Sequence, residues 1–216
     1  FSIPVQPEEK QTHIEKIRFE GFPEYLIRPE GTRDLYSAII YLEPFDWRNQ
    51  RAFGYDMWSN KMRRRAMTYA RDEGVAATSG IITLVQETKE DIQRGFLMYL
   101  PVYQTKTIPK TLQEKREQFE GWVYAPFRAG DLMRGIAGTE DLNIEFEIFD
   151  GETMSQEALL FDSNSELHLN RSQPNQGLQK TVSITLQGRL WTLYFSTHDI
   201  SSENSEKYLP LLVALA

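Results

Sequence analysis

Three carboxylates in the first half of the chain are the residues whose type and spacing come closest to an active site. Glu43, Asp56 and Glu87 fall within 45 residues of one another, and paired carboxylates serve as general acid and base in hydrolytic enzymes. No GxSxG, P-loop or HExxH motif and no Ser/His/Asp order accompanies them. Carboxylates are common in soluble proteins, so these three alone do not indicate catalysis, and we expect a domain that is not an enzyme.

The composition gives little indication that the protein binds a metal ion or a nucleic acid. The chain has no cysteine, and its three histidines, His13, His168 and His198, show no HxH or HxxxH spacing. The formal net charge of −7 repels phosphate, and the basic run at residues 63–65 has no interleaved aromatic residues around it. Such a run is usually a solvated helix face, with anion contact as the alternative. We therefore expect no metal, no cofactor and no nucleic-acid partner.

The length and composition are those of a soluble globular protein. The 216 residues, 40% of them hydrophobic, suit one large domain or two small ones, and the lack of cysteine fits a cytosol or a bacterial periplasm. Residues 1–5 do not have the pattern of a signal peptide. The last run, residues 208–216, is apolar but far shorter than the ~20 residues that cross a bilayer. It is either a helix packed on the core or the start of a membrane helix in a longer parent chain.

Local patterns predict the elements that position the polar residues of the first half. Residues 7–21 have the pattern of a short amphipathic helix that ends at a glycine. Residues 59–74 are predicted to be a helix capped by Ser59, with Gly74 at its end and Met62, Ala66, Tyr69 and Ala70 on one face. Strands are predicted at residues 35–42, 80–86, 95–103 and 121–127. The last three should form an antiparallel sheet with the second helix on one face.

A second, smaller unit is predicted to begin near residues 135–143, after a short helix at residues 131–136. Its strands are expected at residues 144–149, 159–161, 181–186 and 189–197, with a hairpin turn at Gln187-Gly188. The chain is therefore predicted to be an α+β protein made of two units in tandem.

Several motifs in a fixed order resemble the CHASE sensory domain. They are EPFDWRNQRAFGYDM, RRRAM, ARDEG, SGIITLVQE, GFLMYLPVY and GWVYAPFR, and the resemblance is strongest over residues 21–150. It implies an N-terminal helix followed by two tandem PAS-like antiparallel-sheet subdomains. The corresponding division is residues 1–34 for the helix and its lead-in, 35–138 for a membrane-distal ligand-binding subdomain, 139–200 for a membrane-proximal subdomain, and 201–216 for a segment leading to a transmembrane helix.

The resemblance also implies a place and a role for the domain. CHASE domains lie outside the cytoplasmic membrane, so the expected location is the periplasmic or extracellular part of a membrane protein. The parent protein is expected to be a histidine kinase, a nucleotide cyclase, a diguanylate cyclase or a cyclic-di-GMP phosphodiesterase, although none of those catalytic signatures occurs in this chain. Expected partners are a small-molecule ligand and a second copy of the receptor, joined through the N-terminal helix. The membrane is contacted only through flanking helices.

Candidate ligand-binding residues come from a more distant similarity to plant cytokinin receptors. There an aspartate binds an adenine derivative, and the motif GYDM places Asp56 at the matching position. A carboxylate can accept two N–H bonds from a ligand, although Asp56 could equally cap the following helix. Tyr99 is expected to line the pocket or to be a core aromatic, with Thr78 and Gly80 supplying backbone groups. The other predicted ligand-binding residues are Met57, Leu97, Trp122, Tyr124, Arg48 and Gln86.

Two features limit what the ligand can be. Tyr124 and Ala125 stand where the plant receptors have glycines, so their bulk should reshape that wall, and a smaller polar molecule is expected instead of a cytokinin. Arg48 and Gln86 are polar residues set in or beside otherwise apolar strands. Buried polar groups need a partner, so such residues either pair with other polar residues or face a ligand or solvent. A dimerisation or protein-interaction module without a small-molecule ligand remains the alternative, because aromatic residues suit interfaces as well as pockets.

Overall fold

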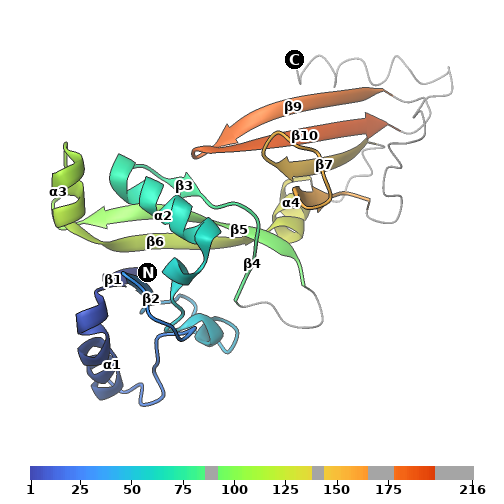
Figure 1. The fold of residues 1–216 in the computed structure, drawn as a ribbon. Helices are drawn as coiled ribbons and strands as arrows, with labels where there is room; N and C mark the ends of the chain where they lie inside the picture. Colours follow the sequence, from blue (N-terminus) through green and yellow to red (C-terminus); the bar gives the residue numbers. More distant parts are fainter. Residues whose placement is uncertain (86–91, 138–143, 165–177, 198–216) are drawn as a thin grey trace. The chain divides into compact units, whose positions relative to one another are not determined.

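A computed structural model describes residues 1–85, 92–137, 144–164 and 178–197 (Figure 1). The fold is α+β, with an N-terminal helix and antiparallel sheets. The chain divides into two compact units: residues 1–131 with 186–189, and residues 132–185 with 190–216. Several residues named above, Gln86, Glu87, His168, His198 and the run 208–216, lie outside the described residues.

The first unit is built on a six-stranded antiparallel sheet. Its strands are β1 (Ser2–Val5), β2 (Tyr36–Ile39), β3 (Ala77–Thr78), β4 (Ile82–Thr83), β5 (Arg94–Tyr103) and β6 (Phe119–Arg128). The order is β2-β1-β6-β5-β3, and β4 also pairs with β5. The long pair β5–β6 confirms the two predicted strands and places Tyr99 directly opposite Tyr124. The prediction for residues 80–86 is too long, because within the described part of that range, residues 80–85, only Ile82 and Thr83 pair as a strand.

Strand β1 was not predicted, and its position explains why. It has four residues, one of them Pro4, and its partners β2 and β6 lie more than 30 and 110 residues away in the sequence. Pairing with distant strands leaves no local signature in so short a segment. The strand matters for the site because it links β2, which precedes Asp56, to β6, which carries Tyr124.

The two helices predicted for the first unit are both present, close to the expected residue ranges. The 3₁₀ turn Pro7–Glu9 and α1 (Lys10–Phe19) confirm the first helix, and Ile14 and Ile17 are buried with Val5, Tyr25, Ile27, Tyr36 and Ala38. Helix α2 (Lys61–Glu73) ends at Gly74, whose φ of +74° confirms the glycine cap. The predicted cap Ser59 is wrong: Asn60 caps α2 by accepting bonds from the Met62 and Arg63 N–H groups. Ser59 instead lies in the 3₁₀ turn Met57–Ser59 and donates to the Asp56 carbonyl.

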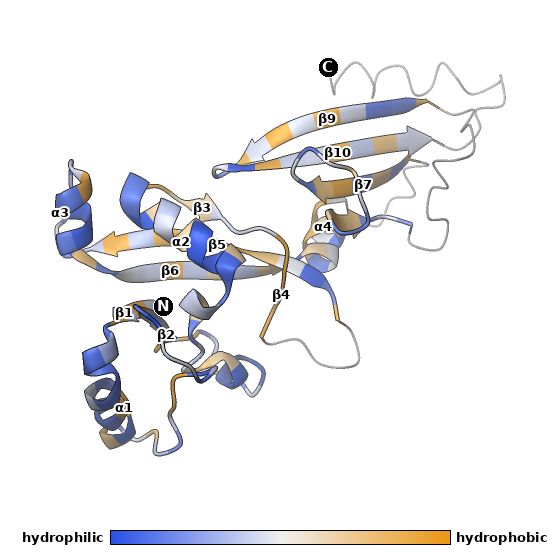
Figure 2. Cartoon of the chain, viewed as in Figure 1, coloured by the Kyte–Doolittle hydropathy of each residue, from blue (hydrophilic) through white to orange (hydrophobic). Residues whose placement is uncertain are grey.

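Helix α2 packs against β5 through a narrow apolar face. Most of its residues are hydrophilic, as its largely blue colour in Figure 2 shows, but Ala66, Met67 and Ala70 are buried in the main core. Arg63 shares this buried face, because positions 63, 66, 67 and 70 follow the helical repeat. The face predicted from the sequence, with Met62 and Tyr69, is therefore wrong in part: Tyr69 is exposed. The buried face was not recognised from the sequence because one of its positions, residue 63, is a charged arginine.

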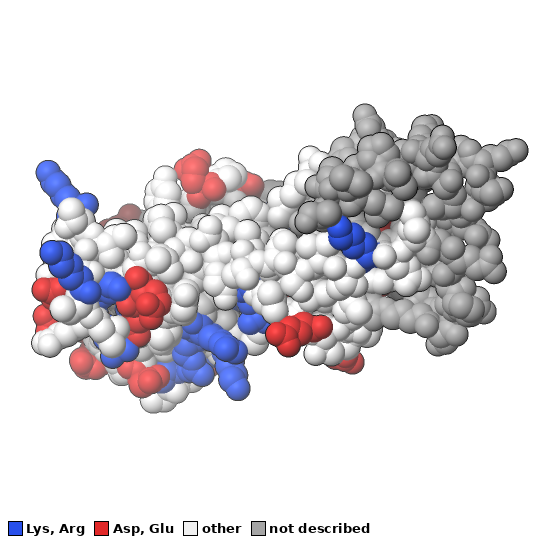
Figure 3. Space-filling view, turned by 90° about the horizontal axis from the view of Figure 1, so that it is seen from above, with Lys and Arg blue, Asp and Glu red and all other residues white. Residues whose placement is uncertain are grey.

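A further helix, α3 (Leu112–Glu117), was not predicted because it lies in a polar stretch. Thr111 and Glu114 form a capping box at its start, and it is joined to α2 by polar contacts. Arg116 pairs with the Asp72 carboxylate, and Lys115 Nζ donates to the Asp72 and Glu73 carbonyls at 3.0 and 2.9 Å. Among the described residues on the face seen in Figure 3, several acidic and basic side chains lie next to one another.

Acid should weaken the contact between α2 and α3. Burial acts to raise the pKa of Asp72, but hydrogen bonds from Arg116 and Arg71 outweigh it and lower the pKa to about 2. Because this value lies below the ~3.9 of an unfolded chain, the carboxylate stabilises the fold above about pH 4 and loses that contribution as the pH falls towards 2. We expect Asp72→Asn to lower the free energy of unfolding by about 1–2 kcal/mol at pH 7 and by much less at pH 2. Urea unfolding at both pH values measures this, and an equal loss at both would contradict it.

The second unit is built on a four-stranded antiparallel sheet, of which residues 186–189 are assigned to the first unit. Its strands β7 (Ile144–Asp150), β8 (Leu159–Asp162), β9 (Gln179–Leu186) and β10 (Arg189–Thr197) lie in the order β8-β7-β10-β9 and confirm the four predicted strands. Gln187 and Gly188 both have positive φ, +45° and +74°, which is the backbone of a tight hairpin turn. Helix α4 (Ala129–Ala137) spans the boundary between the units.

Candidate functional site

Asp56 is fully buried and joins two parts of the first unit. Its Oδ1 atom accepts hydrogen bonds from the backbone N–H of Ser37 in β2, at 2.7 Å, and from that of Trp58, at 3.0 Å. The second bond caps the 3₁₀ turn Met57–Ser59. The other oxygen, Oδ2, lies 3.3 Å from Arg33 Nε. The capping role considered from the sequence is therefore present, although the capped element is this turn and not α2.

Burial raises the pKa of Asp56 above its ordinary value. The Ser37 N–H, the Arg33 guanidinium and the Trp58 N–H act in the opposite direction without cancelling it. The carboxylate is thus a desolvated charge held by groups of its own chain. Oδ2 makes an ion pair with Arg33 but has no hydrogen bond, so it retains acceptor capacity.

Arg63 is buried without an acidic partner. Only 3% of the residue is exposed, and the guanidinium donates one bond, from Nη2 to the Thr83 carbonyl at 3.2 Å. It also lies 4.8 Å from the centre of the Tyr55 ring. The Nε atom is buried and has no hydrogen-bond partner, and no carboxylate among the described residues pairs with Arg63. An unpaired buried charge is costly, so such a group calls for an explanation.

Tyr99 and Tyr124 lie beside Arg63 on the helix-covered face of the sheet. Their ring centroids are 6.2 Å apart. Burial raises the pKa of both phenols, and the nearby Arg63 guanidinium acts in the opposite direction on each. Tyr99 Oη donates to Met57 Sδ at 3.3 Å, whereas Tyr124 Oη is buried and has no hydrogen-bond partner. The cluster thus contains a hydroxyl group, Tyr124 Oη, and a guanidinium N–H group, Arg63 Nε, that are buried without a hydrogen-bond partner among the described residues.

Four of the predicted lining residues belong to the main hydrophobic core. Met57, Leu97, Tyr99 and Trp122 are each 3% exposed or less and pack in one cluster. Trp122 Nε1 also donates to the Met67 carbonyl at 2.9 Å. Tyr99 therefore lies in the core, as the alternative interpretation of this residue expected. A role for these four residues in ligand binding is a proposal.

The remaining predicted residues are dispersed. Thr78 and Gly80 are buried, and Thr78 Oγ1 has no hydrogen-bond partner. Arg48 lies before the 3₁₀ turn Asn49–Ala52, where its backbone N–H donates to Asp46, so it is not beside an apolar strand as predicted. Glu43 is exposed while Asp56 is fully buried. Among the described residues, no group of three His, Cys, Asp or Glu could hold a metal ion.

Arg63 is not among the predicted site residues, although the sequence contains a signal for it. It belongs to the basic run at residues 63–65, for which the sequence favours a solvated helix face, with anion contact as the alternative. Its separation of three, four and seven positions from Ala66, Met67 and Ala70 places it on the buried face of α2. A charged residue at the same helical spacing as the apolar residues is a functional signal, and it is overlooked when the residue is considered only as part of a run of charges.

The fold and these groups define an α+β domain whose first unit keeps unpaired polar atoms in its interior. Residues 1–161 match the family described as the CHASE domain. Because this match covers well over half of the chain, the protein belongs to the CHASE domain family. This is an extracytoplasmic family with a sensory role rather than a catalytic one. A search of curated proteins found no match. No helix among the described residues has the length and apolarity to span a membrane.

Proposed function

We propose that this chain is the ligand-sensing domain of a transmembrane receptor and that it binds a small polar molecule in its first unit. The parent protein would then pass the signal to a cytoplasmic histidine kinase or cyclic-di-GMP enzyme. In this proposal the two units are PAS-like subdomains, and the second relays the change towards the membrane. The family membership supports the sensory part.

One observation favours a ligand near α2. Buried polar atoms without hydrogen-bond partners include Asp56 Oδ2, Thr78 Oγ1, Tyr124 Oη and Arg63 Nε. The first three belong to residues predicted above to bind a ligand, although Thr78 was expected to supply backbone groups and Tyr124 stands where the plant receptors have glycine. Buried polar groups almost always have a hydrogen-bond partner, so a buried group without one often binds a partner that is absent from the structure. Arg63 and Tyr124 both carry donors, and a ligand with a carboxylate, phosphate or carbonyl oxygen would satisfy them together.

Such a ligand could act as a switch because its two contacts come from different elements. Arg63 lies on α2 and Tyr124 on β6, so a ligand bound to both would tie the helix to the sheet. A ligand shifts an equilibrium only by its difference in affinity between two arrangements. The arrangement that brings Arg63 and Tyr124 close together would therefore be the one that ligand binding favours.

Replacing Arg63 by Met tests whether this charge is kept for binding. Met has a similar length and removes an unpaired buried charge, and such replacements are often neutral or stabilising. We expect Arg63→Met to leave the free energy of unfolding without ligand unchanged or to raise it by about 1 kcal/mol. The matched control is Arg64→Met on the exposed side of the same helix, which should change little. A loss of more than about 2 kcal/mol in Arg63→Met alone would assign Arg63 a structural role.

Thermal-shift screening of small polar metabolites identifies the ligand. A compound at 100 times its dissociation constant should stabilise the chain by about 2.7 kcal/mol. Tyr124→Phe removes only the unpaired hydroxyl and should reduce the shift produced by any true hit. Hits that stabilise Tyr124→Phe as strongly as the wild type would place the ligand elsewhere.

A protein-interaction module is the second candidate, and exposed aromatic residues favour it. Phe19 is 94% exposed at the end of α1, and Trp47 and Tyr41 are also exposed. Exposed aromatic residues of this kind are typical of interfaces, and the proposed receptor dimer would use α1. Sedimentation equilibrium of wild-type and Phe19→Ser chains distinguishes the candidates: concentration-dependent association abolished by Phe19→Ser, with no screening hit, would favour this second candidate.

A further inference from the structure

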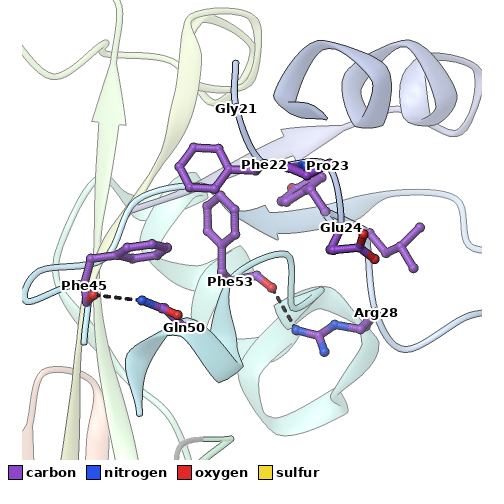
Figure 4. A pocket seen from close by; sticks show the side chains of 10 residues that line it. Gly21, Phe22, Pro23, Glu24, Arg28, Phe45, Gln50 and Phe53 are labelled. Carbon is purple, nitrogen blue, oxygen red and sulfur yellow. Dashed lines mark hydrogen bonds between the residues drawn. The ribbon is translucent and has the colours of Figure 1, made fainter. Parts of the chain in front are cut away.

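A cavity of about 420 Å³ lies between the turn after α1 and the segment that contains the 3₁₀ turn Asn49–Ala52 (Figure 4). Its apolar wall is formed by Phe22, Phe45 and Phe53, whose ring centroids lie 4.9–6.0 Å apart in tilted or edge-to-face pairs. Phe22 and Phe45 remain 39% and 41% exposed, so a solute can reach the rings. The volume is at the small end of the range for small-molecule sites.

Arg28 contributes a positively charged group that is held in place on one side only. Its Nη2 atom donates to the carbonyls of Arg51 and Phe53, at 3.2 and 2.9 Å, and the second of these bonds is drawn in Figure 4. Its Nε and Nη1 atoms have no partner among the described residues, and no carboxylate pairs with it. A guanidinium fixed in this way offers the remaining N–H groups to a carboxylate.

Glu24 supplies the opposite charge on the same cavity. It makes no hydrogen bond or ion pair with any described residue, and it does not pair with Arg28 although both line the cavity. Gln50 adds a neutral acceptor, because its Nε2 donates to the Phe45 carbonyl at 3.2 Å and leaves Oε1 free. The cavity therefore combines a free cation, a free anion and aromatic faces.

The position of Arg28 is set by the backbone of the next segment. Its N–H donates to the Gly54 carbonyl at 2.9 Å, and its carbonyl accepts from the Asp56 N–H. Gly54 has a φ of +76°, and a Cβ there would lie 2.2 Å from the Leu26 carbonyl oxygen. Only glycine allows this close approach, so Gly54 holds the backbone of Leu26 and Arg28, which line the cavity, next to the segment that begins with the lining residue Phe53.

We propose that this cavity binds an α-amino acid with an apolar side chain. The carboxylate would contact Arg28, the ammonium Glu24, and the side chain the phenylalanine rings. The carboxylate of a simple organic acid would be repelled by Glu24, and the ammonium of a simple amine would be repelled by Arg28. A zwitterion can pair with both side chains. This inference goes beyond the proposed function, because the cavity contains neither Arg63 nor Tyr124.

Isothermal titration calorimetry on the 216-residue chain tests this with four probes: L-phenylalanine, L-leucine, 3-phenylpropionate and phenethylamine. The last two lack the ammonium and the carboxylate respectively. We expect both amino acids to bind and both analogues to bind at least about tenfold more weakly than L-phenylalanine, since each loses a charge-assisted hydrogen bond. Glu24→Gln and Arg28→Gln should each weaken L-phenylalanine binding at least about tenfold.

Three controls keep the test independent of folding and of the proposed function. Glu20→Gln removes an exposed acid outside the cavity and should leave binding unchanged. Glu24→Gln alters an exposed side chain with no partner, so it should fold even if Arg28→Gln does not. Tyr124→Phe should leave amino-acid binding intact even where it abolishes a screening hit. The inference is overturned if neither amino acid binds, if an analogue binds as well as L-phenylalanine, if Glu24→Gln has no effect, or if Tyr124→Phe abolishes amino-acid binding.

Discussion

Replacing Asp56 by Ala is expected to destabilise the chain by about 3 kcal/mol or more. The substitution removes the acceptor of the Ser37 and Trp58 N–H groups, and each buried donor left without a partner costs about 1–3 kcal/mol. It also removes the link between β2 and the turn that precedes α2. Urea unfolding of the wild type and the variant, both without ligand, measures the difference.

Asp56→Asn is the matched control because the amide oxygen can still accept both N–H bonds. We expect it to cost less than half as much as Asp56→Ala. The two variants should also differ from the wild type in pH dependence. The pKa of Asp56 is raised in the folded state, so this group favours folding most below about pH 4 and loses that contribution as the pH rises through its raised pKa. Equal losses in both variants would show that the hydrogen bonds to Oδ1 contribute little.

Gly54→Ala should give the second largest effect, a loss of about 3 kcal/mol. A methyl group at this position would lie 2.2 Å from the Leu26 carbonyl oxygen and would clash with it. In addition, alanine would have to adopt a φ of +76°, which by itself costs about 1–2 kcal/mol. Relief of the clash must move the backbone between Leu26 and Arg28. The wall of the aromatic cavity should therefore change along with the stability.

Gly21→Ala separates the two causes. Gly21 also has a positive φ, +108°, and also borders the cavity, but a Cβ there meets nothing within 4 Å. It should show the cost of backbone strain alone, and therefore a smaller loss than Gly54→Ala. If the two variants lost the same stability in urea unfolding, the close approach of Leu26 would not matter.

The elements that could be predicted are those with a strong local signal. Strands β5 and β6 are long, mostly apolar segments. Helix α2 ends at Gly74, which adopts the left-handed conformation that favours glycine at a helix end. Strand β1 and helix α3 could not be predicted in the same way. One depends on pairing with distant strands, and the other on a capping box within a polar stretch.

The candidate site was harder to predict because its important groups break local rules. The sequence pointed to Asp56 and Tyr124, and each of these residues has a buried side-chain oxygen that lacks a hydrogen bond. It did not point to Arg63, since a charge is not expected on the apolar face of a helix. The cavity lined by Phe22, Phe45 and Phe53 was also missed, because these residues are 31 positions apart from first to last and are brought together only by the fold.

Native mass spectrometry is the most direct test of the claim that the first unit binds a small molecule through Arg63 and Tyr124. The wild-type chain, Arg63→Met and Tyr124→Phe would each be incubated with a fractionated extract of small polar metabolites. We predict a discrete mass increase on the wild-type chain that disappears under denaturing conditions and is absent or strongly reduced in both variants. An adduct retained equally by all three chains, or no adduct on the wild type from any fraction, would contradict the proposal.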